Sequence, residues 1–96
     1  MSKVAKQHLL MTATEIETKL RKALAPTHIE VLDDSHLHAG HAGAREGRHF
    51  TVKLASARFT GLARVARHRL VYDSLGPLAQ QGVHALAILA RAPDEA

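Results

Sequence analysis

The stretch that decides the fold class is Arg48-His49-Phe50-Thr51-Val52-Lys53-Leu54. Its apolar residues Phe50, Val52 and Leu54 alternate with polar ones, and successive side chains of a β-strand point to opposite faces of a sheet. The stretch is therefore predicted to be a strand with one face in the core and the other in water. Helices elsewhere in the chain are expected to cover the apolar face.

A second strand is predicted upstream at His28–Asp33, where β-branched residues partly alternate with polar ones and the turn formers Asp33-Asp34-Ser35 follow. The connection between the two strands has about thirteen residues, is rich in glycine and histidine, and is longer than a hairpin needs. Ordered loops of this length are usually functional or mobile.

A helix is predicted to begin near residue 12 and to stop before Pro26, because proline cannot donate the helical hydrogen bond. Two overlapping capping boxes mark its start, Thr12 with Glu15 and Thr14 with Glu17. Its apolar positions recur every four residues and are Ile16, Leu20 and Leu24.

A second helix is predicted within residues 62–79, where Gly76-Pro77 either shortens it or distorts its last turn, and Gly82 ends the segment. Residues 83–90 then form an apolar run, which we interpret as a strand covered on both sides or central in the sheet. The predicted order is α-β-β-α-β. It describes a small α+β domain with a three-stranded sheet and helices on one face.

The length of 96 residues predicts one domain with a single modest core, and 46% hydrophobic with 23% charged residues is typical of a globular chain. We expect residues 1–11 to form a flexible tail and residues 12–93 to form the domain. A chain this short has no room for a deep catalytic cleft, and it shows no nucleophile, cofactor loop or acid–base pair. We therefore expect no enzyme activity.

The absence of cysteine excludes a disulfide scaffold and a thiolate metal site within the chain, and it suits a reducing cytosol. No apolar run approaches the roughly 20 residues that span a bilayer, and the N-terminal run is too short for a signal peptide. We expect a cytoplasmic protein that does not bind membranes.

Three histidines, His36, His38 and His41, stand within six residues of the long connection, and imidazole is a ligand for zinc, copper, nickel and iron. Three interpretations are open: exposed polar side chains, a self-contained zinc site, or one or two ligands of a site completed elsewhere. His84, in an apolar strand, is interpreted as a packed or edge-facing side chain in preference to a metal ligand. The Gly-x-x-Gly at residues 40–43 matches a nucleic-acid-binding loop of KH domains, but it lies between strands and is interpreted as coincidence.

The formal net charge of +4, with histidines neutral, favours acidic partners such as nucleic acid. The start of the second helix is surrounded by three arginines, Arg64, Arg67 and Arg69. Two interpretations are open: these side chains contact phosphate or an acidic protein face, or they form a solvated helix end. His68 lies on the same side of this helix as Val71, and so at the border of the apolar stripe.

Five motifs together resemble the BolA family, in the family's order and over residues 16–93. They are Asp34-Ser35 before the histidine-rich loop, His49-Phe50, Phe59-Thr60-Gly61, Arg67-His68-Arg69-Leu70-Val71-Tyr72 and Val83-His84-Ala85-Leu86-Ala87. The resemblance implies a class II KH-like fold, in agreement with the α-β-β-α-β order. It also implies partnership with a monothiol glutaredoxin, with a 2Fe-2S cluster shared in a heterodimer.

In that arrangement the partner supplies a cysteine and a bound glutathione, and the isolated chain holds no cofactor. The resemblance makes the histidine matching His68 one ligand and a cysteine or histidine of the strand–strand loop the other. Because this chain has no cysteine, it resembles the histidine type. The distance from Asp34-Ser35 favours His38 as the loop ligand, whereas counting back from His49 favours His41.

Two functions are compatible with this resemblance. The first is an adaptor in iron-sulfur cluster assembly or trafficking, without catalysis of its own. The second is a DNA-binding transcriptional regulator, in which Arg64, Arg67, Arg69 and Lys53 would contact the DNA and binding would weaken with salt. The sequence identifies neither the glutaredoxin nor a DNA target, and it leaves open whether the isolated chain forms a homodimer.

Overall fold

The computed structural model describes residues 11–34 and 48–95, in which the elements follow the predicted order. The helices are α2 (Ala13–Leu24) and α3 (Arg64–Leu75), and the strands are β1 (His28–Asp33), β2 (Arg48–Ala55) and β3 (Val83–Arg91). Two short 3-10 turns, η3 (Ala57–Phe59) and η4 (Ala79–Gln81), precede and follow α3. The α+β architecture predicted from the sequence is confirmed.

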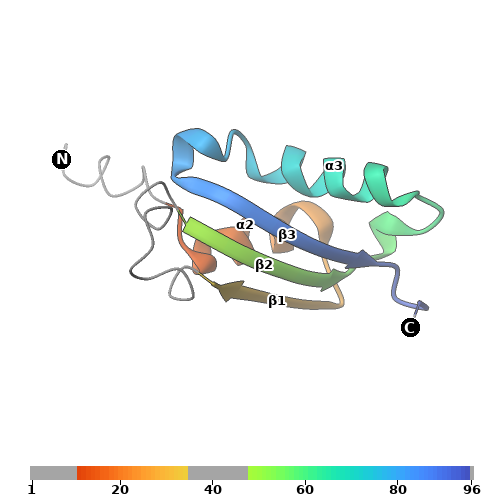
Figure 1. Cartoon of the computed structure of the whole chain (residues 1–96). Coiled ribbons are helices and arrows are strands. Elements are labelled where there is room, and N and C mark those ends of the chain that lie inside the picture. The colour runs from red at the N-terminus through yellow and green to blue at the C-terminus, as the bar shows by residue number, and fades with distance from the viewer. Residues whose placement is uncertain (1–10, 35–47, 96) are drawn as a thin grey trace.

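The three strands form one mixed sheet in the order β1-β2-β3, with β2 in the centre. β1 runs antiparallel to β2, whereas β3 runs parallel to β2 because α3 carries the chain back along the sheet (Figure 1). A parallel pair needs a long crossover of this kind, usually a helix. The start of β2 therefore lies beside the start of β3 and the end of β1.

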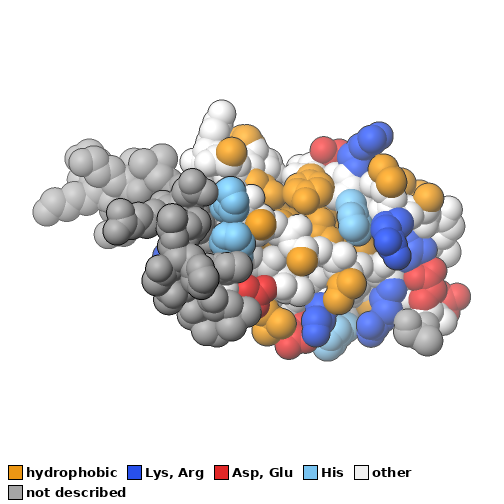
Figure 2. All heavy atoms as spheres, in the orientation of Figure 1, with side chains coloured by type: hydrophobic (Ala, Val, Ile, Leu, Met, Phe, Trp, Pro, Cys, Tyr) orange, Lys and Arg blue, Asp and Glu red, His pale blue; other side chains and the backbone are white. Residues whose placement is uncertain are grey.

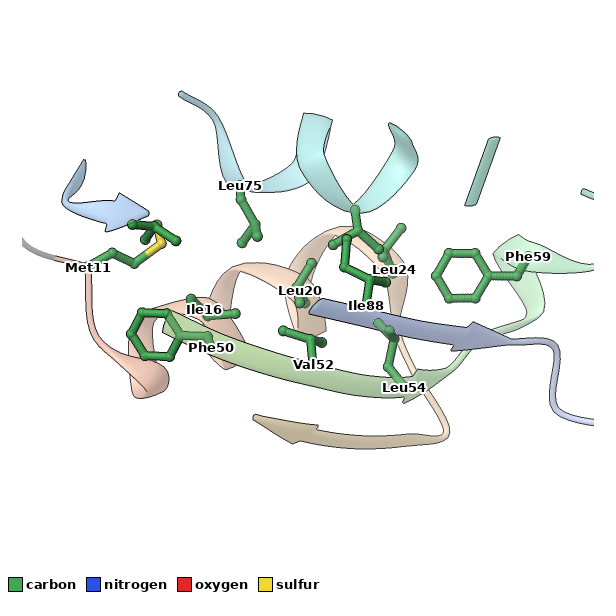
Figure 3. Close-up of a cluster of buried hydrophobic side chains, with 12 residues drawn as sticks. Met11, Ile16, Leu20, Leu24, Phe50, Val52, Leu54, Phe59, Leu75 and Ile88 are labelled. Atoms are coloured by element: carbon green, nitrogen blue, oxygen red, sulfur yellow. The ribbon is translucent and has the colours of Figure 1, made fainter. Parts of the chain in front are cut away.

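Both helices pack against the same face of the sheet, and their apolar stripes meet the alternating residues of β2 in one core (Figure 3). The largest fully buried apolar side chains are Phe50, Phe59, Met11, Ile16, Leu20, Leu24, Leu54, Leu75, Val52 and Val71. The prediction that β2 has one buried and one wet face is confirmed, because its polar residues point to the opposite, uncovered face.

β3 differs from its prediction, because it is an edge strand and not central or covered on both sides. His84, Ala85 and Ala87 are exposed, and the Leu89 side chain is 59% exposed. The prediction failed because an alanine side chain is apolar but small, so its exposure to solvent costs little free energy. The apolar run of β3 therefore leaves part of the sheet's uncovered face apolar.

The start of α2 has the predicted capping box. The Thr12 side chain accepts a hydrogen bond from the Glu15 backbone N–H, and the Glu15 carboxylate accepts one from the Thr12 backbone N–H. The tail prediction is wrong at Met11, which is fully buried and donates its backbone N–H to the carbonyl of Gln81. Residues 1–10 lie outside the described residues.

The second helix was predicted within residues 62–79, but α3 ends earlier, at Leu75. Gly76 follows with φ 83° and ψ −168°, a backbone conformation that is essentially open to glycine alone. Of the two outcomes predicted for Gly76-Pro77, shortening of the helix is the one observed.

Candidate functional site

The histidine-rich connection is anchored at both ends to the same end of the sheet. The Asp34 backbone N–H donates to the His49 carbonyl at 2.7 Å, and the Arg48 backbone N–H donates to the Gly82 carbonyl at 2.9 Å. An ion pair between Arg48 and Asp33, at 3.4 Å, joins the two ends. His36, His38, His41 and the Gly-x-x-Gly lie outside the described residues, so their predicted roles stay predictions.

Two histidines of the described chain meet at these anchored ends. The rings of His49 at the start of β2 and His84 at the start of β3 have centroids 5.1 Å apart, at 50° to each other. His49 is half-buried and His84 is exposed. We name this the histidine pair.

A β-bulge produces this pair. Arg48 is opposite Val83 but the next residue, His49, is opposite Ala85, so His84 is the extra residue of β3. Val83 is buried in the core, and Leu86 packs against the core on the same side. The two residues between them, His84 and Ala85, are both left exposed. A bulge re-aims a side chain in this way, and bulges are frequent beside functional sites.

His68 lies in a different part of the molecule. It is half-buried on the second turn of α3, as the helical pattern predicts, and it lines a pocket together with Lys53, Arg64 and Leu89. Lys53 is opposite Leu89 in the sheet, four residues beyond His49, which corresponds to about 13 Å along β2. Figure 2 shows two adjacent histidine side chains at one end of the sheet and another among lysine and arginine side chains towards the other end.

The described residues include His68 but neither His38 nor His41, so whether these predicted ligands come together stays a prediction. The anchored ends of the histidine-rich connection lie beside His49 and His84, and His68 is remote from them. Among residues 11–34 and 48–95, no group of three or more His, Cys, Asp or Glu side chains is arranged to hold a metal ion. A metal at the histidine pair would need further ligands from the connection or from a partner.

The three predicted contact arginines also differ from one another. The Arg67 side chain, 13% exposed, is held by the protein itself: its Nε–H donates to the Leu62 carbonyl, and its two terminal nitrogens donate to the Glu95 carboxylate at 2.6 and 2.8 Å. One of them also donates to the Ala90 carbonyl at 3.2 Å. Arg67 thus braces α3 against the end of β3, which leaves little of its guanidinium for a partner.

The contact between Arg67 and Glu95 shifts the pKa values of both side chains. The hydrogen bond from Arg67, followed by the one from the Ala92 backbone, lowers the pKa of Glu95 to about 2, and the Glu95 carboxylate in turn raises the pKa of Arg67. Arg64 and Arg69 are exposed, and Lys53 is half-buried. Arg64 and Lys53 line the pocket beside His68, whereas Arg69 does not.

The sequence did not predict the histidine pair, although His84 was interpreted alone and His49 was part of a family motif. The available signal was positional: His49 is the second residue of one predicted strand and His84 the second residue of another. Only the parallel pairing of β2 with β3, and the bulge in it, brings them together. Chemically the pair offers two imidazoles, which suit zinc, copper, nickel or iron.

No helix in the described part of the chain is long and apolar enough to cross a membrane.

Comparison with known proteins gives a consistent result. A family model described as BolA-like protein matches residues 20–95. An uncharacterized protein in the cobS 5' region of a Sinorhizobium species is 44% identical over 89 residues, which covers 88% of this chain and 96% of that protein. The DNA-binding transcriptional regulator BolA of Escherichia coli is 43% identical over 79 residues, covering 82% of this chain and 73% of that protein.

The fold has the same relatives. The solved BolA domain of SufE1 from Arabidopsis thaliana superposes with a TM-score of 0.76 at 44% identity, covering 88% of this chain and 94% of that one. The family match, the sequence identities and the shared fold agree, and this chain belongs to the BolA family.

Proposed function

We propose that this chain is a non-catalytic adaptor in iron-sulfur cluster assembly or trafficking, and that it shares a 2Fe-2S cluster with a monothiol glutaredoxin. The observation that supports this most strongly is the histidine pair. A bulge turns His84 outward beside His49, at the end of the sheet where the histidine-rich connection is anchored. The donor set fits one iron of such a cluster, because imidazole nitrogen is an accepted ligand in place of a thiolate.

In this proposal His84 is the ligand from the folded domain and His49 holds its ring in place. His38 or His41 is the second ligand from the connection, and the partner supplies thiolates from a cysteine and from glutathione. His84 replaces His68 as the preferred ligand because it is exposed and lies beside the connection's ends. Imidazole in place of thiolate raises the reduction potential of such a cluster and makes its binding sensitive to protonation.

The test is anaerobic reconstitution with a glutathione-loaded monothiol glutaredoxin, followed by visible circular dichroism. The wild-type chain is expected to give a spectrum distinct from that of glutaredoxin alone. His84→Ala is expected to lose this spectrum, while His68→Ala keeps it. His28→Ala, which removes an exposed histidine at the other end of β1, is the matched control.

Three results would decide against parts of the proposal. No distinct spectrum and no complex with the wild-type chain would reject the adaptor function. Loss of the spectrum in His68→Ala but not in His84→Ala would restore His68 as the ligand. Loss in His28→Ala would show that any histidine removal disturbs the complex.

A second candidate is DNA binding, which is favoured by the Escherichia coli relative's description as a DNA-binding transcriptional regulator. Arg64 and Lys53 would then contact phosphates. Binding of a DNA duplex should weaken steeply with salt, and Arg64→Ala should lower the slope of that dependence by about one unit. An unchanged slope in Arg64→Ala would remove this residue from the DNA interface.

A further inference from the structure

The pocket beside α3 has a charge pattern that the iron-sulfur proposal does not require, and it contains Lys53 and Arg64, the two residues that the DNA-binding alternative would use. It has a volume of about 560 Å³ and lies where the first turns of α3 pass the end of β3. Its lining brings together cationic side chains from three elements: Lys53 from β2, Arg64 from α3 and Arg91 from β3. No acidic side chain of the described residues lines it. The pocket is therefore a concave, positively charged surface.

These three cations have no ion-pair partner among residues 11–34 and 48–95. Glu30 is opposite Lys53 in the register of β1 with β2, but no ion pair joins them. Arg67, the fourth cationic residue of the lining, is different because the Glu95 carboxylate meets its charge. Like charges gathered at one place raise the free energy of the folded chain, and a bound anion would relieve that cost.

Apart from His68, the rest of the lining is apolar and includes the half-buried Leu62 and the largely exposed Leu89. A volume of this size lies within the range of small-molecule sites, which are mostly apolar with a few placed polar groups. The lining thus fits a compact ligand that has an anionic group and a short apolar part.

We propose that this pocket binds a small phosphate-bearing molecule, with the phosphate between Lys53, Arg64 and Arg91 and its apolar part against Leu62 and Leu89. Arginine binds phosphate through parallel N–H bonds, and lysine adds a point charge. Convergence of the charges in one hollow favours a compact ligand over an extended nucleic acid. The inference does not rest on the iron-sulfur proposal, because its residues lie apart from the histidine pair.

The test uses the full chain alone, without metal or glutaredoxin, in low salt. Pyrophosphate and adenosine monophosphate are the probes, and adenosine, which lacks the phosphate, is the ligand control. Binding is followed by backbone amide shifts in nuclear magnetic resonance spectra and by calorimetry. We expect both phosphate probes to shift the amides around residues 62–64 and 89–91, and adenosine to leave them unchanged.

Variants then separate the pocket from general charge attraction. Lys53→Ala, Arg64→Ala and Arg91→Ala should each weaken adenosine monophosphate binding by about tenfold, which is typical of a lost hydrogen bond to a charged group. Lys22→Ala removes the same charge from the exposed face of α2, outside the pocket, and should change binding by less than about twofold.

Three outcomes would overturn the inference. One is the absence of amide shifts at the pocket with either phosphate probe. Another is an equal loss in Lys22→Ala, which would reveal only general attraction to a basic chain. The third is a short DNA duplex that binds much more tightly than the small probes and shifts amides well beyond the pocket, which would assign these cations to nucleic acid.

Discussion

The two ends of the sheet present different chemistry to solvent. Where β2 begins, a bulge places His49 and His84 side by side next to the anchors of the histidine-rich connection. Where β2 finishes, cations surround a pocket that includes His68. Imidazoles are metal ligands, whereas a cluster of cations repels a metal ion and attracts an anion. The comparison teaches that a histidine's function depends on its surroundings as much as on its motif.

The largest expected effect concerns metal binding by the isolated chain. His84→Ala should weaken binding of Ni²⁺ to the untagged protein by about tenfold or more, because a ligand is lost, while His68→Ala should change it by less than about twofold. Isothermal titration calorimetry measures both. A greater loss in His68→Ala than in His84→Ala would reverse the assignment of the two ends.

The core offers a way to perturb each end separately. Phe50 is buried and directly follows His49 at the start of β2. Phe59 is also buried and belongs to η3, the turn that precedes α3 in the chain (Figure 3). Each substitution to leucine should lower the free energy of unfolding by about 1–2 kcal/mol in urea, because the smaller side chain leaves part of the space unfilled.

The two substitutions should differ in their effect on the histidines. Phe50→Leu is expected to shift the ring resonances of His84 in nuclear magnetic resonance spectra and to leave those of His68 unchanged. Phe59→Leu is expected to do the opposite. Equal shifts at both histidines in either variant would mean that the two ends respond as one unit.

Much of the fold could be predicted from local pattern. The alternation in β2, the Thr12 capping box and the glycine after α3 each act over a few residues, so the elements follow from the sequence directly. Strand order could not be predicted in the same way, because the alanines of β3 are compatible with either a buried or an exposed face. Pairing depends on contacts between distant segments.

The candidate site was harder to predict for the same reason. His49 and His84 are 35 residues apart in the sequence, and a one-residue bulge decides whether they share a face. The family resemblance implied a ligand role for His68, which stays a prediction, and nothing in the motifs indicated that His84 would lie beside His49. Arg67 looked like a free cation in the sequence, whereas its partner, Glu95, lies 28 residues away.

A smaller effect is expected at the connection between α2 and β1, near the pocket's end of the sheet. Ala25 has φ 44° and ψ 56°, the left-handed conformation that favours glycine. Ala25→Gly should therefore raise the free energy of unfolding by about 0.5 kcal/mol, after allowance for the greater freedom of glycine in the unfolded chain. Thermal and urea unfolding measure it, and a loss of stability would show that this conformation carries no strain.

The smallest effect concerns the Arg67–Glu95 brace and appears as a pH dependence. Arg67 and the Ala92 N–H hold the pKa of Glu95 at about 2 in the folded chain, against an ordinary 4.5. Because the folded pKa is the lower one, the brace stabilises the chain fully above pH 4.5, and its contribution is lost as the pH falls towards 2. Glu95→Gln should therefore lower the urea midpoint at pH 6, and the difference from wild type should vanish near pH 2.

The control is Glu30→Gln, which replaces an exposed carboxylate on β1 and should behave like wild type at pH 6. A constant difference between Glu95→Gln and wild type at both pH values would mean that the side chain acts through its shape and not its charge.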